Sequence, residues 1–203
     1  MKGQKDVQKE EALRLTRAMR LMRVQVKSGI AIDGGAHVGS WTVQMAKYFK
    51  VIHAFEPCWE SFAMLCENVI NADLKAEVHP HNKALMDKES LVRIVTPSGR
   101  STLTARQVRE CNRGNIEGIA IDDLELEGCD LIKLDLEGAE GLALKGARKT
   151  IKKYHPVLIV EFNNLARHFG GSEDQIKKML EKMGYVQRWK EGVDKGYVWQ
   201  EKV

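Results

Sequence analysis

The stretch IAIDGGAHVGSWT, residues 30–42, passes from an apolar segment through an aspartate and two glycines into an amphipathic segment. The apolar residues stop at Asp33 and Gly34, as a buried strand does where the chain turns at its end. The residues that follow, 38–49, have the pattern of a helix. A strand, a glycine turn and a helix form the place where open α/β sheets bind nucleotide-like ligands. The stretch therefore predicts a mostly parallel sheet with a ligand site at the end of this strand.

The composition is that of one globular domain. The chain has 203 residues, of which 43% are hydrophobic and 30% are charged, and this length is enough for a single core. No apolar run approaches the roughly 20 residues that span a bilayer, and the polar N-terminal segment lacks the features of a secretory signal. The four cysteines form no CxxC pair, which predicts reduced thiols. We expect one domain over residues 1–203, with the cytoplasm as its default location.

The positive charge is concentrated in a leader segment. Residues 1–27 carry eight basic and three acidic side chains, a net charge of +5, so the rest of the chain contributes −1 to the total of +4. We expect a basic amphipathic leader helix within residues 1–28, with an apolar face made of Leu15, Ala18, Met19, Met22 and Val26. Such a helix either covers the sheet or contacts an anionic substrate, a nucleic acid or a membrane surface. The pattern leaves both interpretations open.

Strand and helix patterns alternate along the rest of the chain. Strands are expected at 30–33, 51–55, 77–80, 131–135 and 157–162, with helices at 38–49, 58–70, 139–152 and 173–183. Hairpins are expected from 84–86 with 91–95 and from 185–189 with 196–200, a short extended segment at 119–124, and a long substrate-side loop at 96–118. This order predicts a mostly parallel sheet with helices on both faces and one antiparallel strand at an edge.

Three nucleotide-type ligands compete for the site at the glycine turn. A phosphate-binding loop needs Gly-Lys-Ser/Thr at the start of the helix, which the chain lacks there. A dinucleotide site needs G-x-G-x-x-G, which Gly34, Ala36 and Gly39 match only loosely. S-adenosylmethionine carries a sulfonium and an ammonium instead of phosphates, and such cations favour carboxylates at the strand ends. Asp33 supplies a carboxylate directly before the glycines.

Two later strands add carboxylates at the same edge of the sheet. Residues 51–55 lead to Glu56, where a carboxylate can accept both hydroxyls of a ribose. The segment DLIKLDLEGAE, residues 130–140, places Asp135 and Glu137 at the end of another strand. Burying acids there is costly unless they are paired, for example with Lys133, or face a cleft. A capping arrangement around Gly138 is the structural alternative.

A series of motifs resembles the FkbM family of S-adenosylmethionine-dependent methyltransferases. The series is AIDGGAHVGSWT, HAFEPCWESFAMLCEN, HNKAL, IDDL, DLIKLDLEGAEGLALKGA and PVLIVEFN, which together run from about residue 30 to 163. The resemblance implies a class I Rossmann-like α/β fold, with a mostly parallel seven-stranded sheet and an antiparallel C-terminal hairpin. It also implies that residues 82–84 lie near the adenine. His37 is a departure, because the family usually has Asn at this position of the turn.

The motifs and the resemblance together predict the cofactor-binding residues. They are Asp33, Gly34, Gly35, Ala36, His37, Gly39, Glu56, Pro57, Asn82, Lys83, Ala84 and Asp135. For catalysis, Asp135 is the first candidate to remove the acceptor's proton or to orient the acceptor, and Glu137 is the second. A Mg²⁺ ion held by these acids is an alternative to a site without metal, and we assign no metal ligands. His79 and His81 alternate on a strand and are interpreted as polar edge residues, with metal binding as the alternative.

The acceptor atom is expected to be an oxygen. Methyltransferases of exocyclic base amines have an Asn/Asp-Pro-Pro-aromatic element after the fourth strand, where this chain has Asp-Leu-Glu-Gly. We therefore expect methylation of a hydroxyl on a sugar, polysaccharide or small metabolite. Methylation of an RNA ribose through the basic leader, and a non-catalytic scaffold that binds the cofactor, are the alternatives. The oligomeric state stays open.

Overall fold

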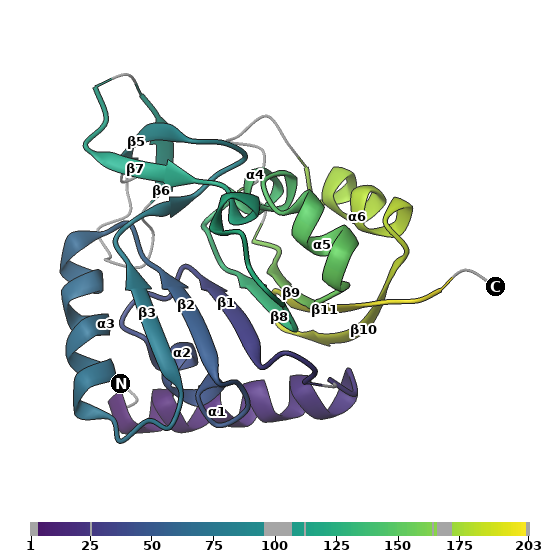
Figure 1. Cartoon of the computed structure of the whole chain (residues 1–203), viewed down its shortest axis with the longest axis horizontal. Helices are drawn as coiled ribbons and strands as arrows, with labels where there is room; N and C mark the ends of the chain where they lie inside the picture. The colour runs from purple at the N-terminus through teal and green to yellow at the C-terminus, as the bar shows by residue number, and fades with distance from the viewer. Residues whose placement is uncertain are drawn as a thin grey trace.

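The computed structural model of the chain describes residues 4–24, 26–95, 107–111, 113–163, 165 and 172–201. A seven-stranded sheet forms its centre, with helices on both faces, and a smaller four-stranded sheet lies beyond one end of it (Figure 1). The main sheet confirms the mostly parallel α/β class that the alternating pattern predicts. The small sheet contains the part of the chain for which the sequence predicts a hairpin and a long loop.

The main sheet has the strand order β10-β11-β9-β8-β1-β2-β3. Its strands are β1 (Ile30–Gly34), β2 (Val51–Phe55), β3 (Glu77–His81), β8 (Leu131–Leu134), β9 (Val157–Glu161), β10 (Tyr185–Glu191) and β11 (Asp194–Trp199). The chain order reverses between β1 and β8, and such switch points are where open α/β sheets bind ligands. The predicted antiparallel strand exists, but its place at an edge is wrong. It is β11, which lies between β9 and β10 and pairs antiparallel with both, so that β10 takes the edge.

One face of the sheet is covered by α1 (Gln4–Leu21), α2 (Ser40–Met45) and α3 (Trp59–Asn71). The apolar side of α1 is buried against α2 and the sheet, through Leu15, Ala18, Met19 and Met22. The leader helix therefore covers the sheet, as one of the two interpretations expects. Val26 does not belong to this face, because the helix ends at Leu21 and Val26 is 42% exposed.

The opposite face carries α4 (Glu140–Lys145), α5 (Arg148–Tyr154) and α6 (Glu173–Lys182). The expected single helix over 139–152 is therefore wrong, since it is broken at Gly146. The backbone there approaches Met86 so closely that a Cβ on Gly146 would lie 2.1 Å from its carbonyl oxygen. The next helix, α5, begins shortly after this break. The Asp122 carboxylate caps its first turn by accepting hydrogen bonds from the backbone N–H groups of Lys149 and Thr150.

The small sheet corrects three expectations. Its strands are β4 (Ala84–Leu85), β5 (Ser90–Val95), β6 (Gln107–Glu110) and β7 (Ile116–Ile119), in the order β4-β7-β5-β6. β4 and β5 do not form the expected hairpin, because each pairs with β7. β6 and most of β7 fall within the expected loop 96–118, of which 96–106 and 112 lie outside the described residues. The short 3₁₀ helix η1 (Ile121–Leu124) replaces most of the expected extended segment 119–124.

Asp130 ties the start of β8 to the start of β1. Its carboxylate accepts hydrogen bonds from the backbone N–H groups of Lys27, Ser28, Gly29 and Ile30. These hydrogen bonds outweigh the effect of burial and lower the pKa of Asp130. The segment between the leader helix and the sheet is thus anchored by one ionised side chain.

Two further expectations concern cysteines and membranes. Cys58, Cys66, Cys111 and Cys129 form no disulfide within the described residues, in agreement with the predicted thiols. Among the helices of the described residues, none combines the length and the apolar character needed to cross a membrane.

Candidate active site

The turn after β1 depends on glycine at two positions. Gly35 has φ +72°, and a Cβ there would lie 1.8 Å from the carbonyl oxygen of Asp135. Gly39 has φ +86°, and its Cβ would lie 2.7 Å from Leu65. His37 also has a positive φ, 51°, a conformation in which Asn and His are enriched among non-glycine residues. The departure from the family's usual Asn at His37 is therefore compatible with the turn.

Asp33 lies beneath this turn in a buried ion pair. Its side chain is 0% exposed, and its oxygens contact the hydroxyl of Thr42 at 2.6 Å and the Lys133 ammonium at 3.1 Å. Burial by itself lowers the pKa of Lys133, but the charges of Asp33 and Asp135 outweigh it and raise this pKa. The expected pairing of Lys133 with an acid near the end of its own strand is confirmed by Asp135, at 3.8 Å. Its closest acid, however, is Asp33, which the sequence did not pair with it. Asp33, Gly34 and Gly39 are not among the residues that line the cavity above the turn.

Glu56 links the turn after β1 to the residue that precedes α3. One carboxylate oxygen accepts a hydrogen bond from the backbone N–H of His37 at 2.9 Å, and the other from that of Cys58 at 2.8 Å. Burial raises the pKa of Glu56, and these two hydrogen bonds oppose the rise. Its carboxylate lines the cavity beside the glycine turn. The structure thus brings Glu56 next to the turn, as the sequence predicts.

Of the three residues expected near the adenine, Lys83 and Ala84 line the cavity and Asn82 does not. The Asn82 amide donates hydrogen bonds to the carbonyl oxygens of Glu56 and Pro57, so it supports the end of β2 without lining the cavity. Lys83 and Ala84 line the cavity. The Lys83 ammonium also lies 2.7 Å from Glu117 of β7. The small sheet therefore holds this end of the cavity in place.

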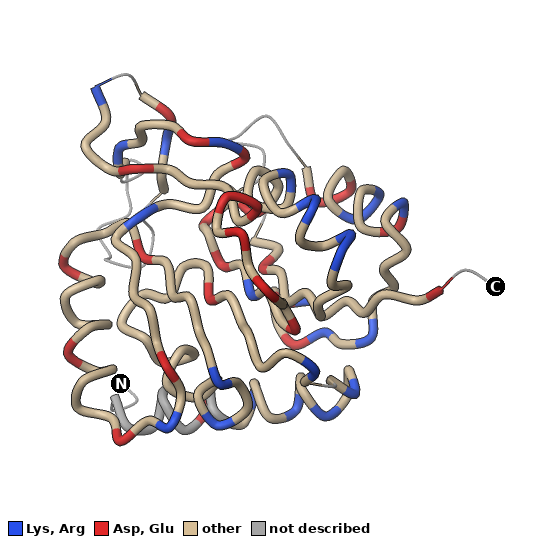
Figure 2. Tube along the Cα trace, in the orientation of Figure 1, with Lys and Arg blue, Asp and Glu red and all other residues tan. Residues whose placement is uncertain are grey.

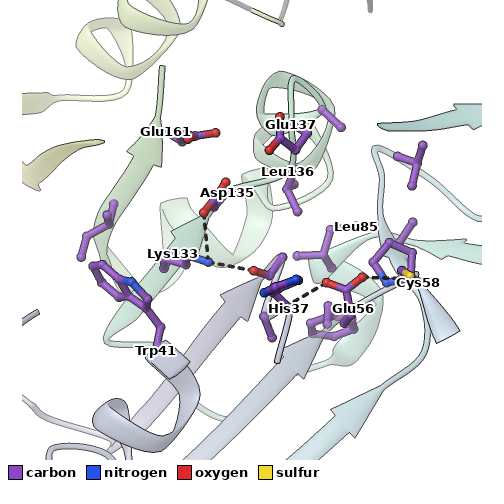
Figure 3. A pocket seen from close by; sticks show the side chains of 18 of the residues that line it. His37, Trp41, Glu56, Cys58, Leu85, Lys133, Asp135, Leu136, Glu137 and Glu161 are labelled. Atoms are coloured by element: carbon purple, nitrogen blue, oxygen red, sulfur yellow. Dashed lines mark hydrogen bonds and ion pairs between the residues drawn. The ribbon is translucent and has the colours of Figure 1, made fainter. Parts of the chain in front are cut away.

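The cavity at the switch point has a volume of about 290 Å³ (Figure 3). Of the predicted residues, it is lined by Gly35, Ala36, His37, Glu56, Pro57, Lys83, Ala84, Asp135 and Glu137. It extends from Glu56 and Lys83 on one side to Trp41, Glu161 and Asp194 on the other. Nine of the predicted residues therefore share one cavity, although they come from four separate segments of the chain.

Asp135, Glu137 and Glu161 form an acidic cluster on one side of the cavity. One oxygen from each carboxyl group lies within 4.8 Å of the others, a spacing that could hold a divalent cation. Burial and the neighbouring Asp135 raise the pKa of Glu161 to about 9, so that Glu161 carries a proton at neutral pH. The Asn163 amide donates hydrogen bonds to Glu161 at 2.6 Å and to Glu137 at 3.3 Å.

The capping arrangement that was the alternative around Gly138 is formed by Glu140. One oxygen of this 2% exposed carboxylate accepts hydrogen bonds from the backbone N–H groups of Leu136 and Gly138. These bonds hold the turn that follows β8, where Glu137 has φ 52° and Gly138 has φ 110°. Glu140 thus shapes the turn, while Asp135 and Glu137 face the cavity.

The histidines of β3 lie outside this cavity. His79 and His81 share one side of the strand with His53 of β2, and the His53 Nδ1 lies 3.2 Å from the His81 Nε2. Burial and the neighbouring histidines lower the pKa of His81 to about 4. Within the described ranges, the acidic cluster is the only group of three or more His, Cys, Asp or Glu side chains spaced to hold a metal ion.

Sequence reasoning missed several residues of the cavity. Trp41 lies within the quoted stretch but was assigned no role, Asp194 follows no motif, and Arg14 reaches the cavity from the leader helix. The Arg14 Nη2 forms an ion pair with Asp194 at 2.5 Å, and burial raises the pKa of Asp194 to about 6. A charged residue on the apolar side of the leader helix was the one available signal for Arg14.

Basic residues lie along α1 and just beyond its end (Figure 2). Arg17 forms a longer ion pair with Glu191, at 3.4 Å, and its side chain is 63% exposed. Arg14 and Arg17 thus join the helix to the β10–β11 hairpin. These two intramolecular contacts account for part of the leader's positive charge, so that this part requires no external anionic partner.

The fold and the cavity define a class of protein. A sheet with this strand order, a glycine turn after β1, an acid after β2 and an inserted antiparallel β11 is the class I S-adenosylmethionine-dependent methyltransferase fold. Residues 33–186 match the model of the methyltransferase FkbM domain. The chain therefore belongs to the FkbM methyltransferase family, as the motifs indicate.

Solved structures are similar to the chain in fold. The FkbM methyltransferase from Methylobacillus flagellatus has a TM-score of 0.59 and 19% identity over 85% of this chain, which spans only 44% of that protein. SMU.1697c from Streptococcus mutans, described as a methyltransferase and solved with SAH, has a TM-score of 0.56 and 13% identity, with 92% and 95% coverage of the two chains. Magnesium protoporphyrin IX methyltransferase from Synechocystis, solved with SAM, has a TM-score of 0.51 and 11% identity, with 95% and 79% coverage. No curated protein matches the chain.

Proposed function

We propose that the chain binds S-adenosylmethionine in this cavity and transfers its methyl group to a hydroxyl oxygen of a sugar, polysaccharide or small metabolite. The observation that carries the proposal is the acidic cluster opposite Glu56 in one cavity at the switch point. Glu56 supports recognition of the ribose hydroxyls, and the cluster supports the chemistry at the other side. Two solved structures that are similar to the chain in fold support this cofactor, because SMU.1697c was solved with SAH and the Synechocystis enzyme with SAM.

The charge of the cavity fits a cationic cofactor. Five carboxyl groups line it, from Glu56, Asp135, Glu137, Glu161 and Asp194, against three basic side chains. Even with Glu161 protonated, acids remain in excess. This balance suits a ligand with a sulfonium and an ammonium, and it opposes the pyrophosphate of a dinucleotide.

Asp135 is the residue best suited to accept the acceptor's proton. Its side chain is 42% exposed, whereas that of Asp33 is fully buried. When bound, S-adenosylmethionine would supply an electrophilic methyl group, whose bond to sulfur breaks in the transfer to leave S-adenosylhomocysteine. Asp135 takes the proton that the hydroxyl loses as its oxygen gains the methyl, and Glu137 orients the hydroxyl from the adjacent turn. Glu161, whose pKa is raised to about 9 by burial and by Asp135, lies beside that carboxylate in the acidic cluster.

The first experiment is calorimetric titration of the purified chain with S-adenosylmethionine and, separately, with NAD. We expect micromolar binding of S-adenosylmethionine alone, and loss of that binding in Glu56→Ala. Lys88→Ala is the matched control, because Lys88 lies outside the cavity in an exposed ion pair with Glu110. Binding of NAD, or equal affinity in Glu56→Ala and the original chain, contradicts the proposal.

The acceptor is then sought with a radiolabelled methyl group. Sugars, polysaccharides and small hydroxylated metabolites are tested beside RNA, in the presence of EDTA or of Mg²⁺. Methylation of a glycan or metabolite hydroxyl supports the proposal. Methylation of RNA alone favours the ribose alternative, and binding without turnover on any acceptor favours the scaffold. Activity that requires Mg²⁺ would assign the acidic cluster to a metal.

A further inference from the structure

Arg14 of the leader helix reaches the cavity from outside the segment that matches the family model. That match begins at residue 33, whereas α1 ends at Leu21. Arg14 nevertheless lines the cavity together with Trp41 and Asp194. The leader helix therefore contributes a charged side chain to the site as well as an apolar face to the core.

The contacts of Arg14 fix its guanidinium without using all of its donors. Its Nη2 donates to the backbone carbonyl of Glu191 at 2.9 Å and pairs with the Asp194 carboxylate at 2.5 Å. A guanidinium has five N–H donors. The Nε of Arg14 is buried and has no hydrogen-bond partner within the described residues. An unpaired buried donor of this kind is costly unless a ligand completes it.

The other two basic side chains of the cavity are already engaged. The Lys133 ammonium has three donors, and three oxygens lie close to it: Asp33 at 3.1 Å, the Gly34 carbonyl at 3.3 Å and the Gly35 carbonyl at 3.0 Å. Lys83 pairs with Glu117 at the Glu56 side of the cavity. Among the basic residues that line the cavity, Arg14 is thus the one with donors left at the far side.

The strand order places Arg14 opposite the ribose site. Asp194, its partner, starts β11 and is paired in register with Glu161 at the end of β9. Glu56 follows β2, on the other side of β8 and β1. A ligand with its ribose at Glu56 that extends across the strand ends past Asp135 therefore arrives at Arg14.

We infer that Arg14 binds the α-carboxylate at the methionine end of S-adenosylmethionine, an inference that rests on the function proposed above. That carboxylate is the one anionic group of the cofactor, and it must enter a cavity in which acids are in excess. A hydrogen-bonded cation offsets the repulsion, and arginine suits a carboxylate because its N–H groups match the geometry of the two oxygens. Asp194 acts as a positioning residue for Arg14. The leader helix is thus part of the cofactor site.

The test compares two ligands by calorimetry. S-adenosylhomocysteine keeps the α-carboxylate, and decarboxylated S-adenosylhomocysteine lacks it but is otherwise the same. We expect Arg14→Ala to weaken binding of S-adenosylhomocysteine about ten- to hundredfold, the range for a lost hydrogen bond to a charged group. Binding of the decarboxylated ligand should stay within about twofold. Arg14→Lys, which keeps the charge, should recover part of the loss.

Arg17→Ala is the matched control, because Arg17 lies on the same helix and pairs with the same hairpin without lining the cavity. It should change neither affinity. Equal weakening of both ligands by Arg14→Ala would show a purely structural role and overturn the inference, as would no change for either. If the unchanged chain binds neither ligand, the proposed function itself fails, which is a different result from binding that ignores Arg14.

Discussion

Asp33 and the acidic cluster of Asp135, Glu137 and Glu161 lie at the same edge of the sheet, but Asp33 is a first, buried set by itself and the cluster is a second set that faces a cavity. Asp33, below the glycine turn, is fully buried and paired with Lys133 and Thr42. Asp135, Glu137 and Glu161, above the turn, crowd within 4.8 Å of one another and face a cavity. In the first set, internal donors satisfy the charge. In the second, acids face acids and the Lys133 ammonium lies 3.8 Å from Asp135, so a proton, a further cation or a cationic ligand must balance the remaining charge.

The comparison separates acids that hold the fold from acids that are available to a ligand. Both sets follow apolar strands, and the sequence motifs give them equal weight. What differs is the number of donors that the tertiary structure brings to each carboxylate. The three predictions below test this difference, beginning with the largest expected effect.

Removing the cation of the buried pair should have the largest effect. We expect Lys133→Met to lower the free energy of unfolding by about 3–5 kcal/mol, because it leaves Asp33 charged and buried without its partner. Urea denaturation measures the change. The double variant Asp33→Asn/Lys133→Met should recover much of the loss, since it removes both charges. A change below about 1 kcal/mol in the single variant would mean that Asp33 does not depend on Lys133.

The cavity acids should affect turnover more than stability. We expect Asp135→Asn to lower kcat about a hundredfold or more, because the amide cannot accept the acceptor's proton. Affinity for S-adenosylmethionine, measured by calorimetry, should be largely retained. Asp123→Asn is a matched control outside the cavity. Full activity in Asp135→Asn would remove Asp135 from the proton transfer.

The smallest effect is a pH-dependent change of stability at Glu161. The pKa of Glu161 is about 9 in the folded chain, against about 4.3 in an unfolded chain. Between these values the folded state holds a proton that the unfolded state lacks, so stability falls as pH rises. Glu161→Gln has no carboxyl group to bind this proton, so its stability does not contain this pH-dependent contribution. We expect it to gain stability relative to the original chain as pH rises from 5 to 9.

After allowance for partial exposure, the gain should be about 1 kcal/mol or more at pH 9. Denaturation curves at pH 5, 7 and 9 measure it. Glu173→Gln is the control, because Glu173 lies outside the acidic cluster and pairs with lysines. A difference between the variant and the original chain that does not change with pH would show that Glu161 is ionised throughout.

Local patterns predicted the main sheet well, and packing explains where they failed. The strands β1, β2, β8 and β9 are short apolar segments with clear ends, so their positions follow from composition. The break at Gly146 could not be predicted, because it results from contact with the backbone of Met86, far away in the chain. The expected hairpin of β4 and β5 failed because β7 inserts between them, and strand pairing over such distances leaves no local signal.

The candidate site shows the same division. Glu56, Asp135 and the glycines were predicted because each follows a strand end and their residue types suit the ligand. Arg14 and Asp194 were missed, since they lie on a helix and a hairpin that meet the site only when the chain is folded. Asn82 was predicted to be near the ligand, but its amide donates to the carbonyl oxygens of Glu56 and Pro57, the two residues after β2.

The sequence by itself determined the α/β class, the family and the edge of the sheet at which the cavity lies. These follow from apolar periodicity, the glycine turn and acids at strand ends, all of which are local. Only the tertiary structure decided which of those acids is neutralised, which one holds a proton and which cation remains for a ligand. The physical reason is that the charge state of a buried group depends on the donors and charges that surround it in space.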